Sequence, residues 1–233
     1  MRSFAHPQAI RYLAHIQHVR EVSLYGHADL AFWRTALRVE GLVPFSADGC
    51  AELAISATAL TWKRFHFREL AITVAVGMEG DETQPGGVFL IRAFNSVPIL
   101  AFAERWLFKT PYYPATINAE EQAPISLALD DHGTPRLRAT MADFRPPPPA
   151  MESAWQGPVF LPRRGAAQGT KFFAILRGTR HHYPFIPGHD RMAIHPSGRH
   201  PVFQQMIDSG FIASEWRVCT NAAHSKSKTY RLA

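Results

Sequence analysis

The order of apolar and polar positions divides this chain into many strands and a few helices. In segment 28–38, Leu30, Trp33 and Leu37 recur on one stripe, which predicts an amphipathic helix. A second helix is predicted at 201–209. Apolar or alternating runs predict strands at 19–25, 51–62, 65–76, 88–94, 125–129, 137–141, 171–177 and 211–220. Because the strands do not alternate strictly with the helices, we expect an α+β chain with mostly antiparallel pairing.

The remaining segments lack a strong period. Residues 1–16 are expected to form an N-terminal arm, with a short helix around 8–18. The polar stretch 80–87 and the segment 150–170 are expected to be loops. The polar segment 221–233 is expected to be a loose tail.

The stretch 95–117 stands at the centre of the chain. Asn95 or Ser96 is suited to cap a helix that is apolar on nearly every face, so we expect this helix to be buried. It leads into a proline-bounded aromatic turn that contains Tyr112 and Tyr113. Charge near the end of a buried helix is costly unless it is paired, which draws attention to Glu104, Arg105 and Lys109. The alternative is that these charges reach solvent at the helix end.

Length and composition favour a single domain over residues 1–233, with 46% hydrophobic residues. Cys50 and Cys219 are too few for a disulfide scaffold or a metal site, so we expect both to be reduced. No apolar run reaches the ~20 residues that span a bilayer, and the first residues do not resemble a secretory signal. We therefore expect a cytoplasmic protein without a membrane partner.

The net charge is +6 and the pI is about 9.6, but the arginines are scattered along the chain. The sequence contains no zinc-finger, helix-turn-helix or RNP pattern, so no nucleic-acid partner is expected. A positive field of this kind favours small anionic molecules. We expect a small-molecule substrate or ligand, and the sequence leaves a homo-oligomer open.

Aromatic residues and Arg/Glu pairs are the first candidates for a site. Tyr112 and Tyr113, with Trp106 and Phe108 nearby, could form one wall of a mostly apolar pocket, or they could be ordinary core residues. Three doublets join arginine, which grips carboxylates, to glutamate, whose pKa rises in an apolar pocket: 20–21, 68–69 and 104–105. The alternative is three surface ion pairs of little energetic value.

A histidine-rich segment is the remaining candidate for chemistry. Five histidines and one aspartate fall within twenty residues: His181, His182, His189, His195, His200 and Asp190. Imidazole and carboxylate suit zinc or iron, but the spacing matches no standard ligand pattern. We therefore predict no metal and no cofactor, and keep a metal-dependent enzyme as an alternative.

Two blocks of sequence resemble the acetoacetate decarboxylase-like superfamily, over roughly residues 17–220. The first block is 19–22 followed by 28–30, which is similar to the family's first strand and short helix. The second is 101–113, which is similar to the family motif A-x-G-R-E-x-x-x-x-P-K-K and has its arginine at Arg105. The resemblance implies a curved, mostly antiparallel sheet, a partly closed barrel around a central pocket.

The resemblance does not carry over the family's reaction. The motif's two lysines, one of which forms a Schiff base in the family, stand at Tyr112 and Tyr113 here, and a phenol forms no imine. Lys109 is the lysine next to these positions. The family's first arginine is matched by Arg20, and its pocket glutamate is matched loosely by Glu69.

The resemblance predicts a protein that binds a small carboxylate or keto acid and is a candidate lyase. Arg20 would bind the carboxylate, Glu69 would donate or accept the proton, and Tyr112 and Tyr113 would polarise the carbonyl, with Lys109 a further catalytic candidate. Four neighbours are expected to contact the substrate: Glu104, Arg105, Trp106 and Phe108. Proton transfer through an enolate is favoured over imine chemistry. The alternatives are a non-catalytic binding or sensor protein and a metal-dependent enzyme using 181–200.

Overall fold

The computed structural model describes residues 10–78, 80–141, 145–163 and 169–232. Three helices occur in these ranges: α1 (Leu30–Arg38), α2 (Pro98–Leu107) and α3 (Val202–Asp208). The strands are β1 (Tyr12–Ala28), β2 (Ser46–Ala47), β3 (Cys50–Trp62), β4 (Phe65–Met78), β5 (Asp81–Asn95), β6 (Tyr112–Pro114), β7 (Thr116–Glu120), β8 (Ser126–Asp131), β9 (Thr134–Thr140), β10 (Met151–Leu161), β11 (Thr170–Pro184), β12 (Arg191–Ile194), β13 (Ile212–Ser227) and β14 (Tyr230–Arg231). None of these helices is long and apolar enough to cross a lipid bilayer.

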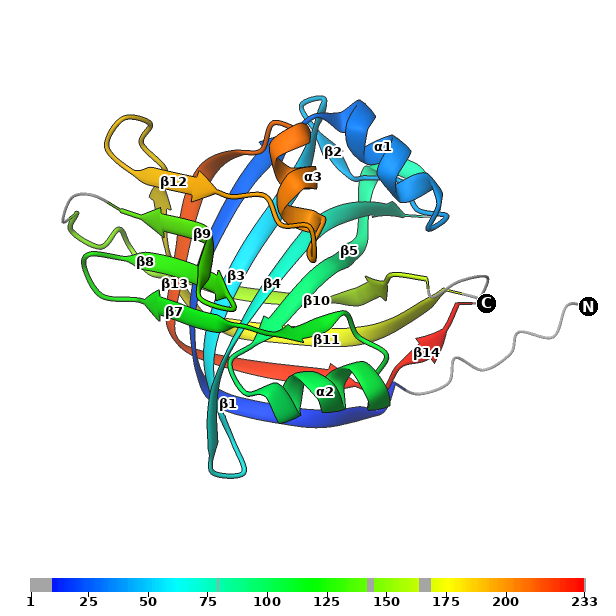
Figure 1. Cartoon of the computed structure of the whole chain (residues 1–233), viewed down its shortest axis with the longest axis horizontal. Coiled ribbons are helices and arrows are strands. Elements are labelled where there is room, and N and C mark those ends of the chain that lie inside the picture. Colours follow the sequence, from blue (N-terminus) through cyan, green and yellow to red (C-terminus); the bar gives the residue numbers. More distant parts are fainter. Residues whose placement is uncertain (1–9, 79, 142–144, 164–168, 233) are drawn as a thin grey trace, which may run out of the picture.

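The large sheet curves until it meets itself (Figure 1). Its strand order is β1-β13-β11-β10-β5-β4-β3-β2, and β1 also pairs with β3, which joins the two ends into a ring. Neighbours are antiparallel except where β5 pairs with β10 and with β6. The β5–β10 junction is short, with two paired positions, Val159 with Val88 and Phe160 with Phe89. The sheet is therefore a partly closed barrel with an inner and an outer face.

The outer face carries the main hydrophobic core. The second sheet, β12-β9-β8-β7, and the helices α1 and α3 lie over it (Figure 1). Large, fully buried side chains from both layers form this core: Leu24, Trp33, Leu53, Ile55, Leu70, Ile72, Phe94, Leu127 and Phe203. Each such side chain contributes about 1.5–3 kcal/mol on burial, so this packing stabilises the contact between the ring and the layer that covers it.

The inner face is more polar. Residues paired in register across a sheet share a face, so Glu21, Thr58, Glu69 and Asn95 form one row across β1, β3, β4 and β5. Two smaller apolar clusters flank this row. One lies on β1, β3, β4 and β13: Val19, Leu60, Phe67, Cys219 and Ala222. The other lies on β5, β6, β10, β11 and α2: Leu90, Ala93, Ala101, Tyr112, Val159, Leu161, Phe172 and Ala174. The charge of Lys226 on β13 acts on Glu69 on β4, although these two strands are not neighbours in the sheet, so this face is the interior of the ring.

The three helices predicted at 28–38, within 95–117 and at 201–209 and most of the predicted strands are confirmed, and the strands predicted at 125–129 and 137–141 pair as a hairpin. The expectations for the two chain ends are wrong. Residues from Tyr12 onward belong to β1 rather than to a helix, and 221–227 continue β13 rather than forming a loose tail. These polar ends pair with each other, Tyr12 opposite Ser227, and this long-range pairing is absent from any local pattern. The first nine residues of the expected arm lie outside the described residues.

Two predicted loops are also strands. Segment 151–161 is β10, and the polar stretch 81–87 lies in β5. Both segments pair with longer neighbouring strands, β11 and β4, which extend them beyond their own apolar residues. Sheet pairing therefore overrides weak local propensity.

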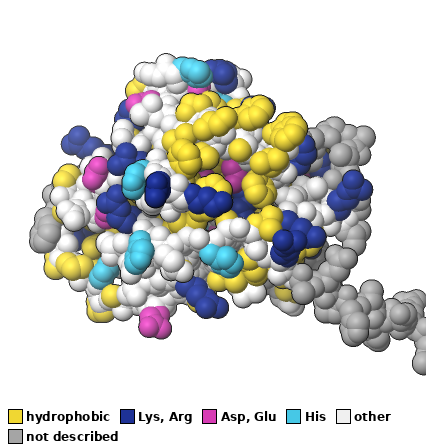
Figure 2. All heavy atoms as spheres, turned by 90° about the horizontal axis from the view of Figure 1, so that it is seen from below, with side chains coloured by type: hydrophobic (Ala, Val, Ile, Leu, Met, Phe, Trp, Pro, Cys, Tyr) yellow, Lys and Arg dark blue, Asp and Glu magenta, His cyan; other side chains and the backbone are white. Residues whose placement is uncertain are grey.

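The central helix α2 is largely exposed, which corrects the expectation of burial. Its large apolar side chains Ile99, Phe102, Trp106 and Leu107 are between 60% and 64% exposed, and among its residues Ala101 is buried. Figure 2 shows hydrophobic side chains gathered on the face seen from below, the side on which Figure 1 places α2. The helix is thus apolar on two sides, one against the ring and one toward solvent.

Candidate functional site

Glu69 on β4 is the centre of a polar group inside the ring. The Asn95 amide donates a hydrogen bond to Glu69 Oε1 over 3.0 Å, and the Tyr112 hydroxyl donates one to Oε2 over 3.0 Å. Asn95 Oδ1 in turn accepts the backbone N–H of Val97 at 2.8 Å, which fixes the amide orientation. The carboxyl group is therefore held by two neutral donors.

The surroundings of Glu69 raise its pKa to about 7. Burial is the largest cause, and the negative charge of Glu104 adds to it. The charge of Lys226 and the hydrogen bonds from Tyr112 and Asn95 act in the opposite direction but do not cancel the rise. A carboxyl group with this pKa exchanges protons near neutral pH, as a general acid or base requires.

Tyr112 remains a neutral phenol in this site. Burial raises its pKa well above 10, and the charges of Glu69 and Glu104 raise it further. Its hydroxyl can therefore donate a hydrogen bond to an oxygen that gains negative charge, as it does to Glu69 in this structure.

Lys226 on β13 brings a cation to the same group. Its Nζ lies 2.5 Å from Glu104 Oε2, and the Thr110 hydroxyl donates to the same oxygen over 2.7 Å. The ammonium also lies 4.8 Å from the ring centres of Phe108 and of Phe172. The side chains of Glu104 and Lys226 remain 18% and 20% exposed, so the group is not sealed off.

A second buried charge group lies on the same inner face. Glu21 Oε2 is 3.5 Å from Arg180 and 3.4 Å from His224 Nε2, and the Ser23 hydroxyl donates to Oε1 over 2.8 Å. Burial alone would raise the pKa of Glu21, but the His224 ring and the Arg180 charge lower it to about 2. Thr58 separates Glu21 from Glu69 in the row across the sheet.

The residues proposed from sequence do not all share one site. Arg20 is 52% exposed and forms an ion pair with Glu121 at 2.6 Å, outside the group around Glu69. Trp106 is exposed on α2, whereas Phe108 contacts the Lys226 ammonium. Glu69, Glu104 and Tyr112 come together as described above.

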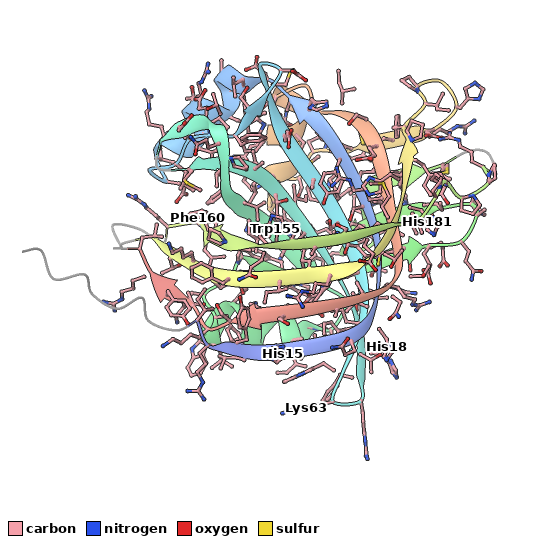
Figure 3. The ribbon with its side chains drawn as sticks, turned by 180° about the vertical axis from the view of Figure 1, so that it is seen from behind. His15, His18, Lys63, Trp155, Phe160 and His181 are labelled. Carbon is pink, nitrogen blue, oxygen red and sulfur yellow. The ribbon has the colours of Figure 1, made fainter. Side chains whose placement is uncertain are left out.

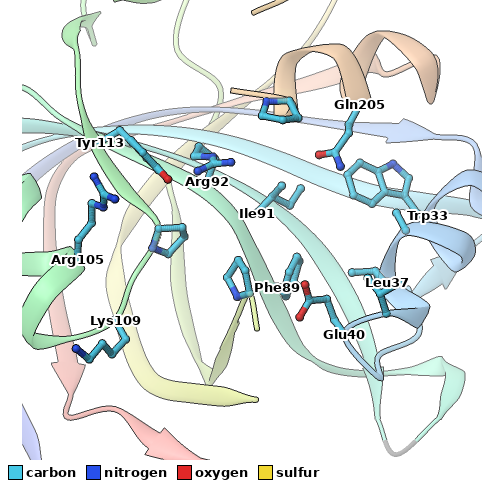
Figure 4. Close-up of a pocket in the computed structure, with 15 residues that line it drawn as sticks. Trp33, Leu37, Glu40, Phe89, Ile91, Arg92, Arg105, Lys109, Tyr113 and Gln205 are labelled. Atoms are coloured by element: carbon cyan, nitrogen blue, oxygen red, sulfur yellow. The ribbon is translucent and has the colours of Figure 1, made fainter. Parts of the chain in front are cut away.

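The other predicted residues line a different cavity. Arg105, Lys109 and Tyr113 border a space of about 520 Å³ between α1, β5, β6 and α3 (Figure 4). Tyr112 and Tyr113 lie in one strand, where successive side chains point to opposite faces. The tyrosine pair therefore belongs to two places, with Tyr112 inside the ring and Tyr113 outside it.

The histidines of 181–200 are dispersed. His181 contacts the carbonyl oxygen of Pro148 at 2.8 Å, on β11 in Figure 3, and His182 contacts Glu215 at 2.7 Å. His200 is buried beside Phe94 and Tyr113. Among the described residues, no three His, Cys, Asp or Glu side chains are arranged to hold a metal ion.

Sequence reasoning missed Asn95, Thr110 and Lys226 as members of the site. The predicted helix cap at Asn95 or Ser96 is wrong, because Val97 is the N-cap of α2 and no side chain caps it. Asn95 instead accepts the N–H of Val97 and donates to Glu69. Lys226 was placed in the tail, although His224, Lys226 and Lys228 alternate with smaller residues at the spacing of a strand. That period of two is the signal that points to the extension of β13.

Solved structures of three enzymes have a similar fold. The structure of the enduracididine biosynthesis enzyme MppR complexed with pyruvate matches with a TM-score of 0.64 and 11% identity, covering 99% of this chain and 93% of that one. Acetoacetate decarboxylase from Legionella pneumophila matches with a TM-score of 0.63 and 13% identity, covering 100% of this chain and 93% of that one. An acetoacetate decarboxylase-like enzyme from Sphingomonas wittichii RW1 matches with a TM-score of 0.60 and 13% identity, covering 94% of this chain and 92% of that one.

No protein-family model matches the chain. No curated protein sequence matches it significantly. The structural matches confirm the predicted fold, an acetoacetate decarboxylase-like α+β architecture built on a curved, mostly antiparallel sheet.

Proposed function

We propose that this protein binds a small carbonyl compound with a carboxylate group inside its ring and transfers a proton next to the carbonyl. The observation that carries this proposal is the convergence of Glu69, Tyr112, Glu104 and Lys226 on the inner face of an acetoacetate decarboxylase-like fold. Pyruvate is the first compound to test, because the structure of MppR with this fold is complexed with it.

Each group has a distinct role in the proposed reaction. Lys226 replaces Arg20 as the cation that attracts the substrate carboxylate, because Arg20 is turned away. Glu69, with its pKa near 7, removes a proton from the carbon beside the carbonyl. The electron pair of the broken C–H bond moves onto the carbonyl oxygen, and Tyr112 donates a hydrogen bond to the resulting enolate.

The same arrangement supports cleavage of a β-keto acid. In that case the bond to the carboxylate carbon breaks and carbon dioxide leaves. The electron pair of the broken bond forms the enolate. Protonated Glu69 then gives its proton to carbon and regains one from water. Both routes pass through an enolate that Tyr112 can stabilise, so the substrate decides between isomerase-type and lyase-type chemistry.

Exchange of the methyl protons of pyruvate for deuterium tests the proposal. In deuterium oxide, wild-type protein should wash the methyl signal out of the proton NMR spectrum, and Glu69→Gln should not. The cleavage route is tested with acetoacetate as substrate, by measuring the carbon dioxide that is released. Absence of both exchange and cleavage, with a ligand-dependent rise in melting temperature, would instead support the non-catalytic binding protein.

Treatment with borohydride in the presence of pyruvate separates enolate from imine chemistry. We expect no covalent label, because the Lys226 ammonium is held by Glu104 and Lys109 lies on the outer cavity. A labelled peptide containing Lys226 or Lys109 would replace the enolate route with an imine route.

The exposed apolar stripe of α2 supports the expectation of a homo-oligomer, which remains a prediction. Contact between two copies would remove Phe102 and Trp106 from water. Light scattering should then show an assembly in the wild type and a smaller species for Phe102→Ser with Trp106→Ser. The cytoplasmic location likewise remains a prediction.

A further inference from the structure

The outer cavity is separate from the site inside the ring. It measures about 520 Å³, within the range of small-molecule sites. Figure 4 shows its labelled side chains, which come from α1, β5, α2, β6 and α3, from the turn after α1 (Glu40) and from the segment between α2 and β6 (Lys109). Its lining joins charged and polar groups to a broad apolar floor: Trp33, Leu37, Glu40, Phe89, Ile91, Arg92, Arg105, Lys109, Pro111, Tyr113 and Gln205.

Three cationic side chains and one carboxylate line this cavity. The cations are Arg92, Arg105 and Lys109, and the carboxylate is Glu40. Glu40 is already engaged, because its Oε2 accepts the backbone N–H of Arg163 over 2.8 Å. Within the described part of the chain, none of the three cations has a carboxylate within ion-pair distance. The lining therefore carries excess positive charge.

Two of these cations share one aromatic ring. The Arg92 guanidinium lies 4.6 Å from the ring centre of Tyr113, and that of Arg105 lies 4.5 Å from it. Their attraction to the ring holds both guanidinium groups at the cavity. Like charges gathered around one ring repel each other, and an anion bound between them would remove that cost.

Buried donors in the lining also lack partners. Arg92 Nε and Trp33 Nε1 are both buried and have no acceptor within hydrogen-bonding distance among the described residues. An unpaired buried donor costs free energy, and such groups concentrate where a ligand supplies the acceptor. The unpaired donors are therefore a second observation, separate from the excess positive charge, that points to a bound ligand.

The apolar floor decides what kind of anion fits. Trp33 and Leu37 on α1 face Phe89 and Ile91 on β5 across the cavity (Figure 4). These four side chains are at most 8% exposed and belong to the main core, so they form the solid base of the cavity. The apolar lining that still meets solvent is Ala36, Val39, Pro162 and Pro201. A small inorganic anion would leave that lining uncovered, whereas an aromatic or branched body would cover it.

We propose that this cavity binds an amphipathic organic acid, with its carboxylate between Arg92 and Arg105 and its apolar body against the exposed apolar lining around Ala36 and Val39. The site uses none of the groups assigned to the reaction inside the ring. It would therefore bind its ligand independently of Glu69 and Lys226.

Calorimetry with two probes of the same shape tests the proposal. Indole-3-acetate carries the carboxylate, and indole-3-acetamide replaces it with a neutral amide. We expect the acid to bind at least tenfold more tightly than the amide. Equal affinity for the two probes would overturn the proposal, because the apolar floor alone would then account for binding.

Variants locate the probe. Arg92→Gln and Arg105→Gln should each weaken binding of the acid about tenfold or more, whereas Arg191→Gln, which removes the same charge from an exposed position on β12, should not. Because Arg105 is exposed, its variant should keep the wild-type melting temperature even if Arg92→Gln does not. Unchanged affinity in the Arg105 variant would contradict the site.

Glu69→Gln and Lys226→Met separate this proposal from the proposed function. Both should bind indole-3-acetate as the wild type does. If either variant abolished binding, the acid would occupy the ring interior and the outer site would be rejected. Failure of pyruvate exchange, by contrast, would leave the calorimetric result unaffected.

Discussion

Tyr112 and Tyr113 are neighbours in sequence, yet they belong to two environments with opposite charge. Tyr112 lies inside the ring, where the carboxylates Glu69 and Glu104 share one cation, Lys226. Tyr113 lies outside, between two guanidinium groups that have no carboxylate partner among the described residues. One strand thus separates a site built for proton transfer from a site built to attract an anion.

The comparison shows how the ratio of charges sets the chemistry of a site. Inside, burial and, second to it, the negative charge of Glu104 raise the pKa of Glu69 to about 7, so this group exchanges protons. Outside, guanidinium groups keep their charge at every physiological pH, so they bind anions but transfer no protons. Changes on one side should therefore leave the other side intact, and the following predictions test this.

Glu69→Gln should have the largest effect, a loss of 10²- to 10⁴-fold in pyruvate exchange, because the amide cannot accept the proton. The stability of the folded variant should instead exceed that of the wild type at high pH. A pKa raised from 4.5 to about 7 means that the folded state loses stability as pH rises through that range, by as much as about 3 kcal/mol. Urea unfolding should show Glu69→Gln more stable than the wild type at pH 8 but not at pH 4.5.

Glu21→Gln should destabilise the protein by about 3 kcal/mol at pH 7, because it leaves Arg180 buried without its carboxylate. The pKa of Glu21 is lowered from 4.5 to about 2, so its contribution is present above pH 4.5 and is lost as pH falls toward 2. Urea unfolding as a function of pH should therefore show a flatter acid limb for the variant. An acid limb equal to that of the wild type would show that Glu21 is not ionised in the fold.

Lys226→Met should weaken binding of pyruvate about 10- to 100-fold, because the site loses its cation. It should also raise the pKa of Glu69, since the Lys226 charge lowers it. Lys228→Met is the matched control, because Lys228 is exposed and lies over Tyr230 on β14. An equal loss of pyruvate binding in both variants would show that general charge, and not the site, attracts the ligand.

Tyr112→Phe and Tyr113→Phe compare the two faces directly, with the smallest expected effects. Loss of the Tyr112 hydroxyl removes a hydrogen bond that lowers the pKa of Glu69, so the midpoint of the pH–rate profile should move upward and exchange should fall several-fold. Tyr113→Phe keeps the ring between Arg92 and Arg105 and should leave the profile unchanged. A shift of the same size in both variants would show that the two sites are coupled.

Much of the fold could be predicted from the chain because its signals are local. The stripe of Leu30, Trp33 and Leu37 predicted α1, and the runs at 51–62 and 65–76 predicted β3 and β4. Glu69 was also identified from sequence as a candidate for proton transfer. The apolar composition of α2 was recognised, but its burial was not predictable, because composition does not say how many neighbours a helix has.

The candidate site depended on contacts between distant segments. Lys226 meets Glu104 across 122 positions of the chain, and Arg180 meets Glu21 across 159. Arg20 and Glu21 are adjacent, yet the alternation of β1 turns one toward solvent and the other into the ring. A shift of one residue in that register would exchange them, and the register is set by the partners of the strand.

The chain by itself determined the periods of its segments, and hence the α1 stripe, most of the strands and the tyrosine pair, because propensity and side-chain alternation are properties of neighbouring residues. Tertiary structure alone decided that the polar chain ends pair, that Lys226 lies beside Glu104, and that Tyr112 and Tyr113 belong to different sites. Closing the ring brings together strands that are far apart in sequence, and only that closure gives its inner face a charge balance different from that of the outer cavity.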